Sequence, residues 1–229
     1  MAEKDVLTKE FMSDNEIFAD VFNFYLYDGE KVISPDRLRP LDTTELTLPF
    51  GIDGKSVALQ RFRDVKKGLT AMTDGDRTYL ILAAENQSDI LYSMVAKTML
   101  YDSISYISQI EAIARSHKES GDKPENSGEF LSGFYKSDRL IPVITLTIYF
   151  GADEWDAPTT LYELFGEYDK RLERFIQNYK LNLVAPAEMD DDDFTKLSTD
   201  LSEVLKFIKY SKDKEQLNKV FIPMKNIII

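Results

Sequence analysis

The sequence predicts an α/β domain in which helices flank a central mixed β-sheet. Two observations lead to this prediction: apolar residues recur at helical spacing in several segments, and short β-branched runs alternate with these segments along the chain. The chain has 229 residues, of which 43% are hydrophobic, so it can bury one substantial core. We therefore expect a single domain over residues 1–229, with a core at about 13–185 and a C-terminal helical segment at about 190–229.

The N-terminal half is expected to contain one helix and a β-hairpin. Ser13 and Glu16 have the spacing of a capping box, and the apolar residues that follow predict a helix at about 14–27. Residues 28–56 are rich in Pro, Gly, Asp and Thr, which predicts an irregular connection with one short strand at TELTL. Two strands follow at about 57–72 and 78–86, joined through TDGD.

The C-terminal half is expected to alternate helices and strands. A long helix is predicted at about 89–116, followed by a polar loop that we expect to be mobile. The segment LIPVITLTIYFG is the clearest strand in the chain, because apolar and β-branched residues run up to a glycine. A helix at about 160–177, a strand at YKLNLVAP and a terminal helix at about 191–218 complete the predicted order.

The predicted hairpin places two carboxylates opposite each other. A two-residue turn at Asp74 and Gly75 sets a register in which Asp64 pairs with Glu85. Directly opposed residues have Cβ atoms roughly 4.5–5.5 Å apart and share a face of the sheet, so like charges repel there. A divalent cation between the carboxylates makes the arrangement favourable, because hard cations such as Mg²⁺ bind carboxylate oxygens.

The strand YLILAAENQS ends in polar residues that extend this candidate metal site. Strand alternation places Gln87 on the same face as Glu85, whereas Asn86 points to the opposite face. The alternative explanation is a strand end that emerges into solvent, with an accidental register between Asp64 and Glu85.

A lysine interrupts the apolar face of the helix that follows. Ile90, Met94, Tyr101 and Ile104 fall on one helical stripe, and Lys97 lies within it. A lysine on a buried face requires an anion nearby, which favours a place beside the carboxylates. A side chain that snorkels along the border of the stripe explains the same residue.

Acidic residues dominate the charge of the chain, which is −12 in total with an isoelectric point near 4.7. This balance argues against broad attraction to polyanions such as DNA. One local exception is the segment RFRDVKK, a candidate nucleic-acid contact with four basic residues around Asp64. These residues are Arg61, Arg63, Lys66 and Lys67. An ordinary solvated charge cluster is the alternative explanation.

Two residue types that support common hydrolytic sites are scarce. Cysteine is absent, and His117 is the only histidine, which argues against a thiolate metal site, a zinc site built on histidines or a Ser-His-Asp triad.

The N-terminal MAEKDVLTKEF has no apolar signal-peptide core, and no segment approaches the ~18 consecutive apolar residues of a membrane span. We expect a cytoplasmic protein without a membrane segment.

Three features of the chain together resemble the motif of the PD-(D/E)XK nuclease superfamily: an Asp, a Glu-x-Gln at a strand end, and a Lys on the next helix. The lysine of the superfamily motif lies on the strand, whereas here it has moved to the helix. More specifically, the chain resembles the recombination-promoting nuclease (Rpn) and transposase family. The matching segments are NEIFADVFN, RDV, YLILAAENQS, MVAKTMLYD and LIPVITLTIYFGADEWD. The family pattern often has His-Gln or Phe-Gln in place of Asn86-Gln87, and often Arg in place of Lys97.

The resemblance implies a restriction-endonuclease-like core and a metal-dependent DNA endonuclease. In that activity Asp64 and Glu85 bind Mg²⁺, or Mn²⁺ or Ca²⁺, and the amide oxygen of Gln87 completes the coordination. Lys97 stabilises charge on the scissile phosphate or helps to deprotonate the nucleophile. Glu16 takes the place of the superfamily's helical acid, although a solvated capping residue explains it equally well.

Cleavage of both DNA strands calls for two active sites, so we expect a homodimer with C₂ symmetry. The alternative function is a catalytically inactive interaction or regulatory module on a nuclease fold.

Overall fold

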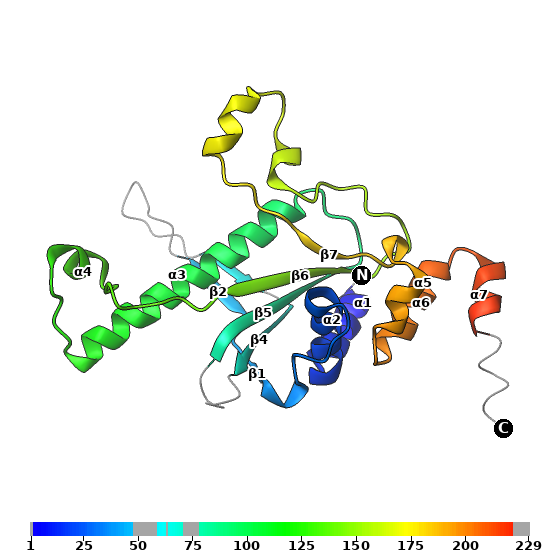
Figure 1. Cartoon of the computed structure of the whole chain (residues 1–229), viewed down its shortest axis with the longest axis horizontal. Coiled ribbons are helices and arrows are strands. Elements are labelled where there is room, and N and C mark those ends of the chain that lie inside the picture. The colour runs from blue at the N-terminus through cyan, green and yellow to red at the C-terminus, as the bar shows by residue number, and fades with distance from the viewer. Residues whose placement is uncertain (1, 48–58, 63, 71–77, 222–229) are drawn as a thin grey trace.

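The computed structural model describes residues 2–47, 59–62, 64–70 and 78–221, and its centre is a five-stranded mixed sheet (Figure 1). The strand order is β1-β4-β5-β6-β7, in which β1, β4 and β5 are antiparallel neighbours and β5, β6 and β7 are parallel. The strands are β1 (Leu38–Pro40), β4 (Val65–Thr70), β5 (Thr78–Gln87), β6 (Val143–Tyr149) and β7 (Asn182–Val184). Helices flank this sheet, which confirms the predicted α/β class and agrees with a restriction-endonuclease-like core.

Two strands replace the single strand that was predicted at 57–72. β3 (Leu59–Phe62) pairs with β2 (Thr44–Thr47) in a separate two-stranded ribbon, and β4 belongs to the main sheet. The prediction was wrong because the chain bends at Asp64, where it passes from one sheet to the other. The ribbon packs against the long helix α3 (Met94–Ser120).

The register of β4 and β5 agrees with the prediction over most of their length. Val65 pairs with Ala84 and Leu69 with Leu80, so one further step would place Asp64 opposite Glu85. The register shifts after Leu69, close to the turn. The predicted turn at Asp74 and Gly75 lies outside the described residues.

The first predicted helix is present as α2 (Asn15–Tyr27), but its cap differs. Asp14, not Ser13, is the N-cap, and its carboxylate accepts the backbone N–H groups of Glu16 at 2.7 Å and Ile17 at 3.3 Å. The predicted capping box is therefore wrong. Ser13 instead ends an additional helix that the sequence did not predict, α1 (Ala2–Ser13).

Apolar side chains cover the two faces of the sheet differently. On one face, α2 and the C-terminal helices bury a large core around Phe18, Phe22, Leu82 and Leu201. On the other face, α3 packs its first turn, Met94 and Val95, against the end of the sheet in a smaller cluster. Even-numbered residues of β5 face the large core, so odd-numbered residues such as Glu85 face α3.

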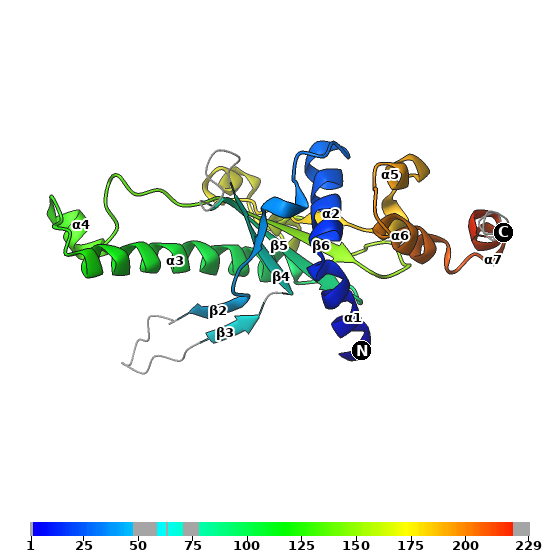
Figure 2. The ribbon, with the colours of Figure 1, turned by 90° about the horizontal axis from the view of Figure 1, so that it is seen from below.

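The long helix α3 extends far beyond the sheet (Figures 1 and 2). It begins at Met94, later than predicted, and continues to Ser120. At its far end, residues 121–138, which include the short helix α4 (Ser127–Ser132), form a folded tip. The polar segment that was expected to be a mobile loop contains α4, and its Asp122 makes a side-chain hydrogen bond with His117 of α3. Within the described residues, no helix combines the length and apolarity needed to cross a membrane.

Shorter elements replace two helices that were predicted in the C-terminal third. The region 160–177 forms two 3-10 helices, η2 (Leu161–Leu164) and η3 (Lys170–Phe175), separated by a segment that contains Gly166, a poor helix former. The terminal helix is divided into α5 (Asp191–Thr195), α6 (Leu201–Tyr210) and α7 (Lys214–Phe221). Two further 3-10 turns are η1 (Pro35–Arg37) and η4 (Pro186–Glu188).

A buried carboxylate explains the break between α5 and α6. Asp20 on α2 is 6% exposed, and it accepts the backbone N–H groups and the hydroxyl groups of both Ser198 and Thr199 at 2.7–3.0 Å. Backbone groups that bind Asp20 cannot continue a regular helix across the same residues. The sequence of the terminal segment alone does not reveal this contact.

Candidate active site

A buried ion pair lies at the carboxyl end of β5. Glu85 is 1% exposed, and its Oε2 is 3.1 Å from Nζ of Lys97 on α3. The lysine keeps 30% of its side chain exposed and also lies over the ring of Tyr101. The predicted stripe on the long helix thus turns Lys97 toward the strand end, with its ammonium group between a buried carboxylate and solvent.

Asp64 reaches the same strand end through the bend between β3 and β4. Its Oδ2 accepts the backbone N–H of Asn86 at 2.8 Å. The carboxylate therefore takes the place of a backbone carbonyl at the point where the β4–β5 ladder stops at Val65. The structure brings Asp64 and Glu85 to the same end of β5, and it gives Asp64 a structural role as well.

The neighbouring amides differ in orientation, as predicted. Gln87 follows Glu85 on the face toward α3, and its Nε2 donates to the backbone carbonyl of Asn86 at 3.0 Å. The side chain of Asn86 lies on the opposite face, where its amide atoms are buried and make no hydrogen bond to the described residues.

A polar pocket of about 340 Å³ opens beside these groups. Its wall includes three of the predicted residues, Asp64, Gln87 and Lys97. It also includes Thr8 from α1 and Asp89 from the turn after β5, neither of which was predicted from the sequence. The helical spacing of Leu7 and Phe11 was the available signal for α1, but nothing in the sequence places that helix against β5.

Glu16 lies outside this pocket, contrary to the expected place of a helical acid. It is exposed on α2 and lines a different pocket with Asp20, Asn23 and Thr199. The reason is that Lys67, which pairs with Leu82 in the middle of β5, holds Ser13 and Asn15 at the start of α2. The structure therefore does not bring Glu16 together with Asp64 and Glu85.

The predicted basic cluster is not a continuous surface, because Lys67 is buried. Lys67 is 3% exposed, and its Nζ donates to the backbone carbonyl of Ser13 at 2.7 Å and to Oδ1 of Asn15 at 2.6 Å. Burial lowers the pKa of Lys67 to about 8, although the nearby Asp14 carboxylate opposes this shift. Lys67 thus links the junction of α1 and α2 to β4 by hydrogen bonds, and its ammonium group is not available to contact DNA.

The other members of the basic cluster have different surroundings. Lys66 is half-buried on β4, and Arg61 lies in β3 opposite Glu45. Arg63 lies outside the described residues.

The donor atoms at the strand end are carboxylate and amide oxygens, which suit a hard divalent cation. The ammonium group of Lys97 already occupies a position against Glu85, which shows that this buried carboxylate accommodates a cation. Across the described ranges, no three or more His, Asp or Glu side chains form a group that could hold a metal ion. A cation at this site would therefore depend on Asp64, Glu85 and the amide oxygen of Gln87.

Comparison with known families identifies the family of the chain. A family model described as "Putative transposase, YhgA-like" matches residues 69–228, which is more than half of the chain. The chain belongs to this family. The part that matches the YhgA-like transposase model contains Glu85, Gln87 and Lys97 but begins after Asp64. No curated protein and no solved structure matches the chain.

Proposed function

We propose that this member of the YhgA-like transposase family is a divalent-cation-dependent DNA endonuclease. The observation that carries the proposal is the buried pair of Glu85 and Lys97 at the end of β5, with Asp64 at the same strand end. Asp64 and Lys97 line the pocket, and Glu85 is buried beside Lys97, which combines a place for a cation with a donor that reaches toward solvent.

The residues have separate roles in this proposal. Glu85 and Asp64 hold Mg²⁺, with the amide oxygen of Gln87 as a third donor. The bound cation would activate water and neutralise charge on the scissile phosphate. Lys97 donates hydrogen bonds to a phosphate oxygen, because its ammonium group lies at the pocket wall and carries three donors.

A second candidate function, a catalytically inactive interaction module, is supported by the way in which the carboxylates are satisfied. Oδ2 of Asp64 accepts the N–H of Asn86, and Oε2 of Glu85 pairs with Lys97. Both acids therefore contribute to the fold without a metal ion. The two functions differ in whether a divalent cation binds at this strand end.

Cleavage of supercoiled plasmid DNA with Mg²⁺ tests the proposal. We expect nicking and linearisation by the wild-type protein, none with EDTA, and a loss of at least ~100-fold in Glu85→Gln and in Lys97→Ala, as is typical when a catalytic group is removed. Lys118→Ala is the matched control, because Lys118 is an exposed lysine near the far end of the same helix.

Thermal unfolding separates the two candidate functions. The endonuclease requires Mg²⁺ to raise the melting temperature of the wild-type protein and not that of Glu85→Gln, because a ligand that binds only the folded state stabilises it. Identical melting temperatures with EDTA and with millimolar Mg²⁺, together with intact plasmid, would support the inactive module instead.

A further inference from the structure

The tip of the α3 arm presents two large apolar side chains to solvent. Phe130 and Leu131 are neighbours on α4, and they are 74% and 83% exposed. The arm is the 27-residue helix α3, which is about 40 Å long at 1.5 Å per residue and carries the tip away from the sheet (Figures 1 and 2). Exposed side chains of this size, placed together at the end of an arm, are typical of a contact with another molecule.

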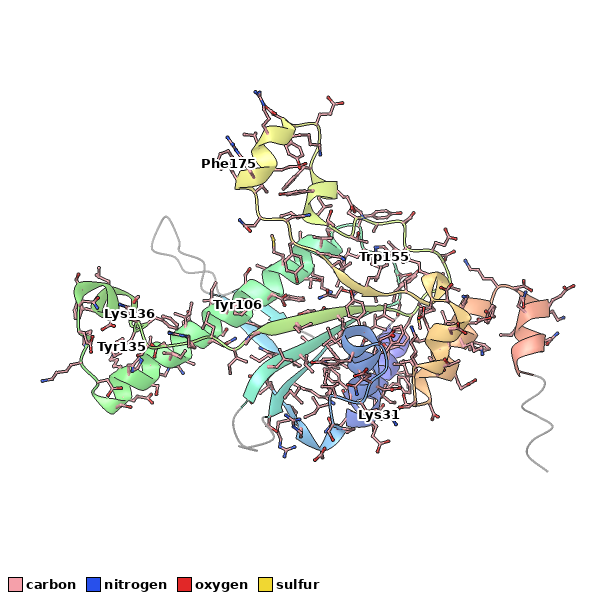
Figure 3. The ribbon with its side chains drawn as sticks, in the orientation of Figure 1. Lys31, Tyr106, Tyr135, Lys136, Trp155 and Phe175 are labelled. Carbon is pink, nitrogen blue, oxygen red and sulfur yellow. The ribbon has the colours of Figure 1, made fainter. Side chains whose placement is uncertain are left out.

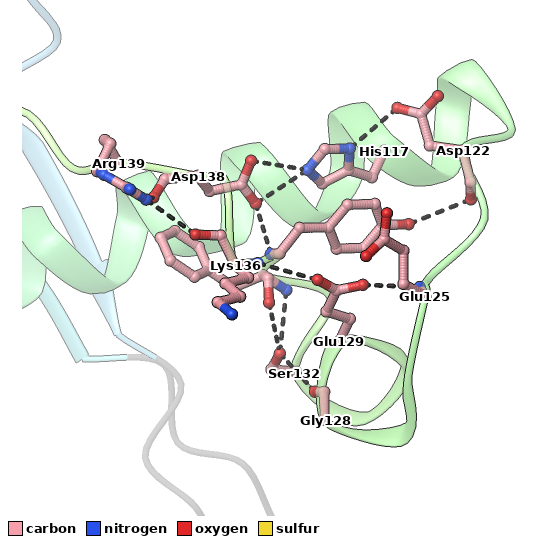
Figure 4. Close-up of polar contacts among 11 residues, drawn as sticks. His117, Asp122, Glu125, Gly128, Glu129, Ser132, Lys136, Asp138 and Arg139 are labelled. Carbon is pink, nitrogen blue, oxygen red and sulfur yellow. Dashed lines mark hydrogen bonds and ion pairs between the residues drawn. The ribbon is translucent and has the colours of Figure 1, made fainter.

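A hydrogen-bonded scaffold holds this tip in one conformation (Figure 4). The buried carboxylate of Glu129 accepts the backbone N–H groups of Glu125 at 2.7 Å and Lys136 at 3.0 Å. His117 joins the end of α3 to Asp138, with Nε2 at 2.9 Å from its carboxylate. A tip ordered in this way loses little conformational entropy when it binds.

An aromatic stack completes the scaffold. The ring of Tyr135 lies 3.8 Å from that of His117, and the two planes are nearly parallel. Figure 3 shows Tyr135 and Lys136 beside the end of α3, next to α4. The folded tip therefore has both an apolar face and an exposed cation, Lys136.

An apolar groove lies between α1 and α6, away from the tip of the arm (Figure 1). Its volume is about 450 Å³, and apolar side chains of Leu7, Phe11, Phe150 and Val204 line it. Leu7 is 59% exposed, and the exposed acid Glu10 lies at the same wall. A groove of this size, within the roughly 300–1,000 Å³ range of binding pockets, has room for large apolar side chains.

The tip and the groove complement each other, and one copy cannot bring them together. Both views show α4 at one end of the molecule, while α1 and α6 lie toward the other (Figures 1 and 2). We propose that the α4 tip of one copy inserts Phe130 and Leu131 into the α1–α6 groove of a second copy. Lys136 beside the tip and Glu10 at the groove have opposite charges, which favours this pairing.

The docking would connect the partner copy to the candidate active site. Thr8 lines both the apolar groove and the polar pocket at the end of β5, so a tip in the groove contacts the helix that forms the wall of that pocket. Reciprocal docking of two tips into two grooves closes a C₂ dimer with two such pockets. This inference does not depend on cleavage activity, and it identifies the surfaces that a homodimer would use.

Cross-linking tests the contact directly, because the chain contains no cysteine. Leu131→Cys and Leu7→Cys each introduce one thiol at an exposed position. The two variants, one carrying a mass tag, are mixed and treated with a short thiol cross-linker. We expect a tagged–untagged dimer in the mixture, several times more abundant than cross-linked dimer in either variant alone.

Phe175→Cys is the matched control, because Phe175 is 69% exposed on η3, away from both surfaces. Mixed with either variant, it should cross-link only at background level. Cross-linking of Leu131→Cys to itself as efficiently as to Leu7→Cys would overturn the proposal, as would a mixture no different from the control.

Light scattering provides an independent measurement on the full chain. We expect the wild-type protein to form dimers at micromolar concentration, and the double variant Phe130→Asp/Leu131→Asp to be a monomer with an unchanged melting temperature. A wild-type protein that is monomeric at every concentration would also overturn the proposal.

Discussion

Glu85 and Lys97 form the contact on which the proposed chemistry of the site depends. The carboxylate is almost completely buried, whereas the lysine is partly exposed at the pocket wall. Burial of a charged carboxylate without a cation beside it is energetically unfavourable. When no metal is bound, the ammonium group of Lys97 is a cation beside Glu85. A divalent cation would have to share Glu85 with the lysine or displace it.

This competition predicts the effect of Lys97→Ala on metal binding. We expect the variant to bind Mg²⁺ several times more tightly than the wild-type protein in calorimetric titrations, because the ammonium group no longer opposes a second cation. Without metal, its free energy of unfolding should fall by ~1–3 kcal/mol, since Glu85 loses a charged partner. Lys118→Ala should change neither quantity. Unchanged Mg²⁺ affinity in Lys97→Ala would show that lysine and metal do not meet at Glu85.

The buried Lys67 predicts a dependence of stability on pH. Its pKa is about 8 in the folded protein and 10.5 ordinarily, so between these values the unfolded chain binds a proton that the folded chain has released. The contribution of Lys67 to the free energy of unfolding therefore rises as pH increases from about 8 to 10.5. In urea unfolding, the difference in stability between the wild-type protein and Lys67→Met should grow with pH over this range, whereas the difference between the wild-type protein and Lys66→Met should stay constant. Parallel pH profiles for Lys67→Met and wild type would contradict the prediction.

At the scale of elements, the C-terminal helices are positioned by a polar contact as well as by apolar packing. Asp20 on α2 receives four donor groups from Ser198 and Thr199, and Leu201 and Leu205 of α6 then complete the core. A buried carboxylate with satisfied oxygens specifies one docking position, because a shift of α6 would leave these oxygens without hydrogen-bond donors.

Replacement of Asp20 tests this arrangement. Asp20→Ala should lower the free energy of unfolding by about 3 kcal/mol, since it leaves buried N–H and hydroxyl groups without acceptors. It should also make the segment between α5 and α6 more sensitive to limited proteolysis. Glu16→Ala, an exposed position on the same helix, should change stability by less than ~0.5 kcal/mol. Equal stability of the two variants would mean that apolar packing alone docks these helices.

At the scale of the whole molecule, the net charge of −12 opposes contact with DNA. The structure removes Lys67 from the predicted basic cluster, so the described surface gains no compensating patch there. In the proposed endonuclease, divalent cations must therefore supply much of the positive charge that attracts the phosphate backbone.

Binding of a labelled DNA duplex, followed by fluorescence anisotropy, tests this dependence. We expect binding in millimolar Ca²⁺ that disappears with EDTA and in Glu85→Gln, because both changes remove the cation from the strand end. Equally tight binding with EDTA would instead indicate a basic contact surface elsewhere on the chain.

The sequence by itself was sufficient for the two central strands and for the long helix, and it brought Glu85 and Lys97 together in one candidate site. Runs of apolar and β-branched residues in YLILAAENQS and LIPVITLTIYFG predict β5 and β6, because strand propensity is a property of the chain itself. Strand alternation places Glu85 and Gln87 on one face, and helical spacing turns Lys97 toward them. These features depend on neighbours within about one helical turn or one hairpin.

Only the tertiary structure decided features that depend on residues far apart in the chain. Such contacts produce three features: the bend at Asp64, the burial of Lys67 under the junction of α1 and α2, and the position of Glu16 in another pocket. The break between α5 and α6 depends on Asp20, which lies 178 residues before Ser198. Local propensity is too weak to oppose a buried charge that requires specific donors, so packing overrides the sequence pattern at these positions.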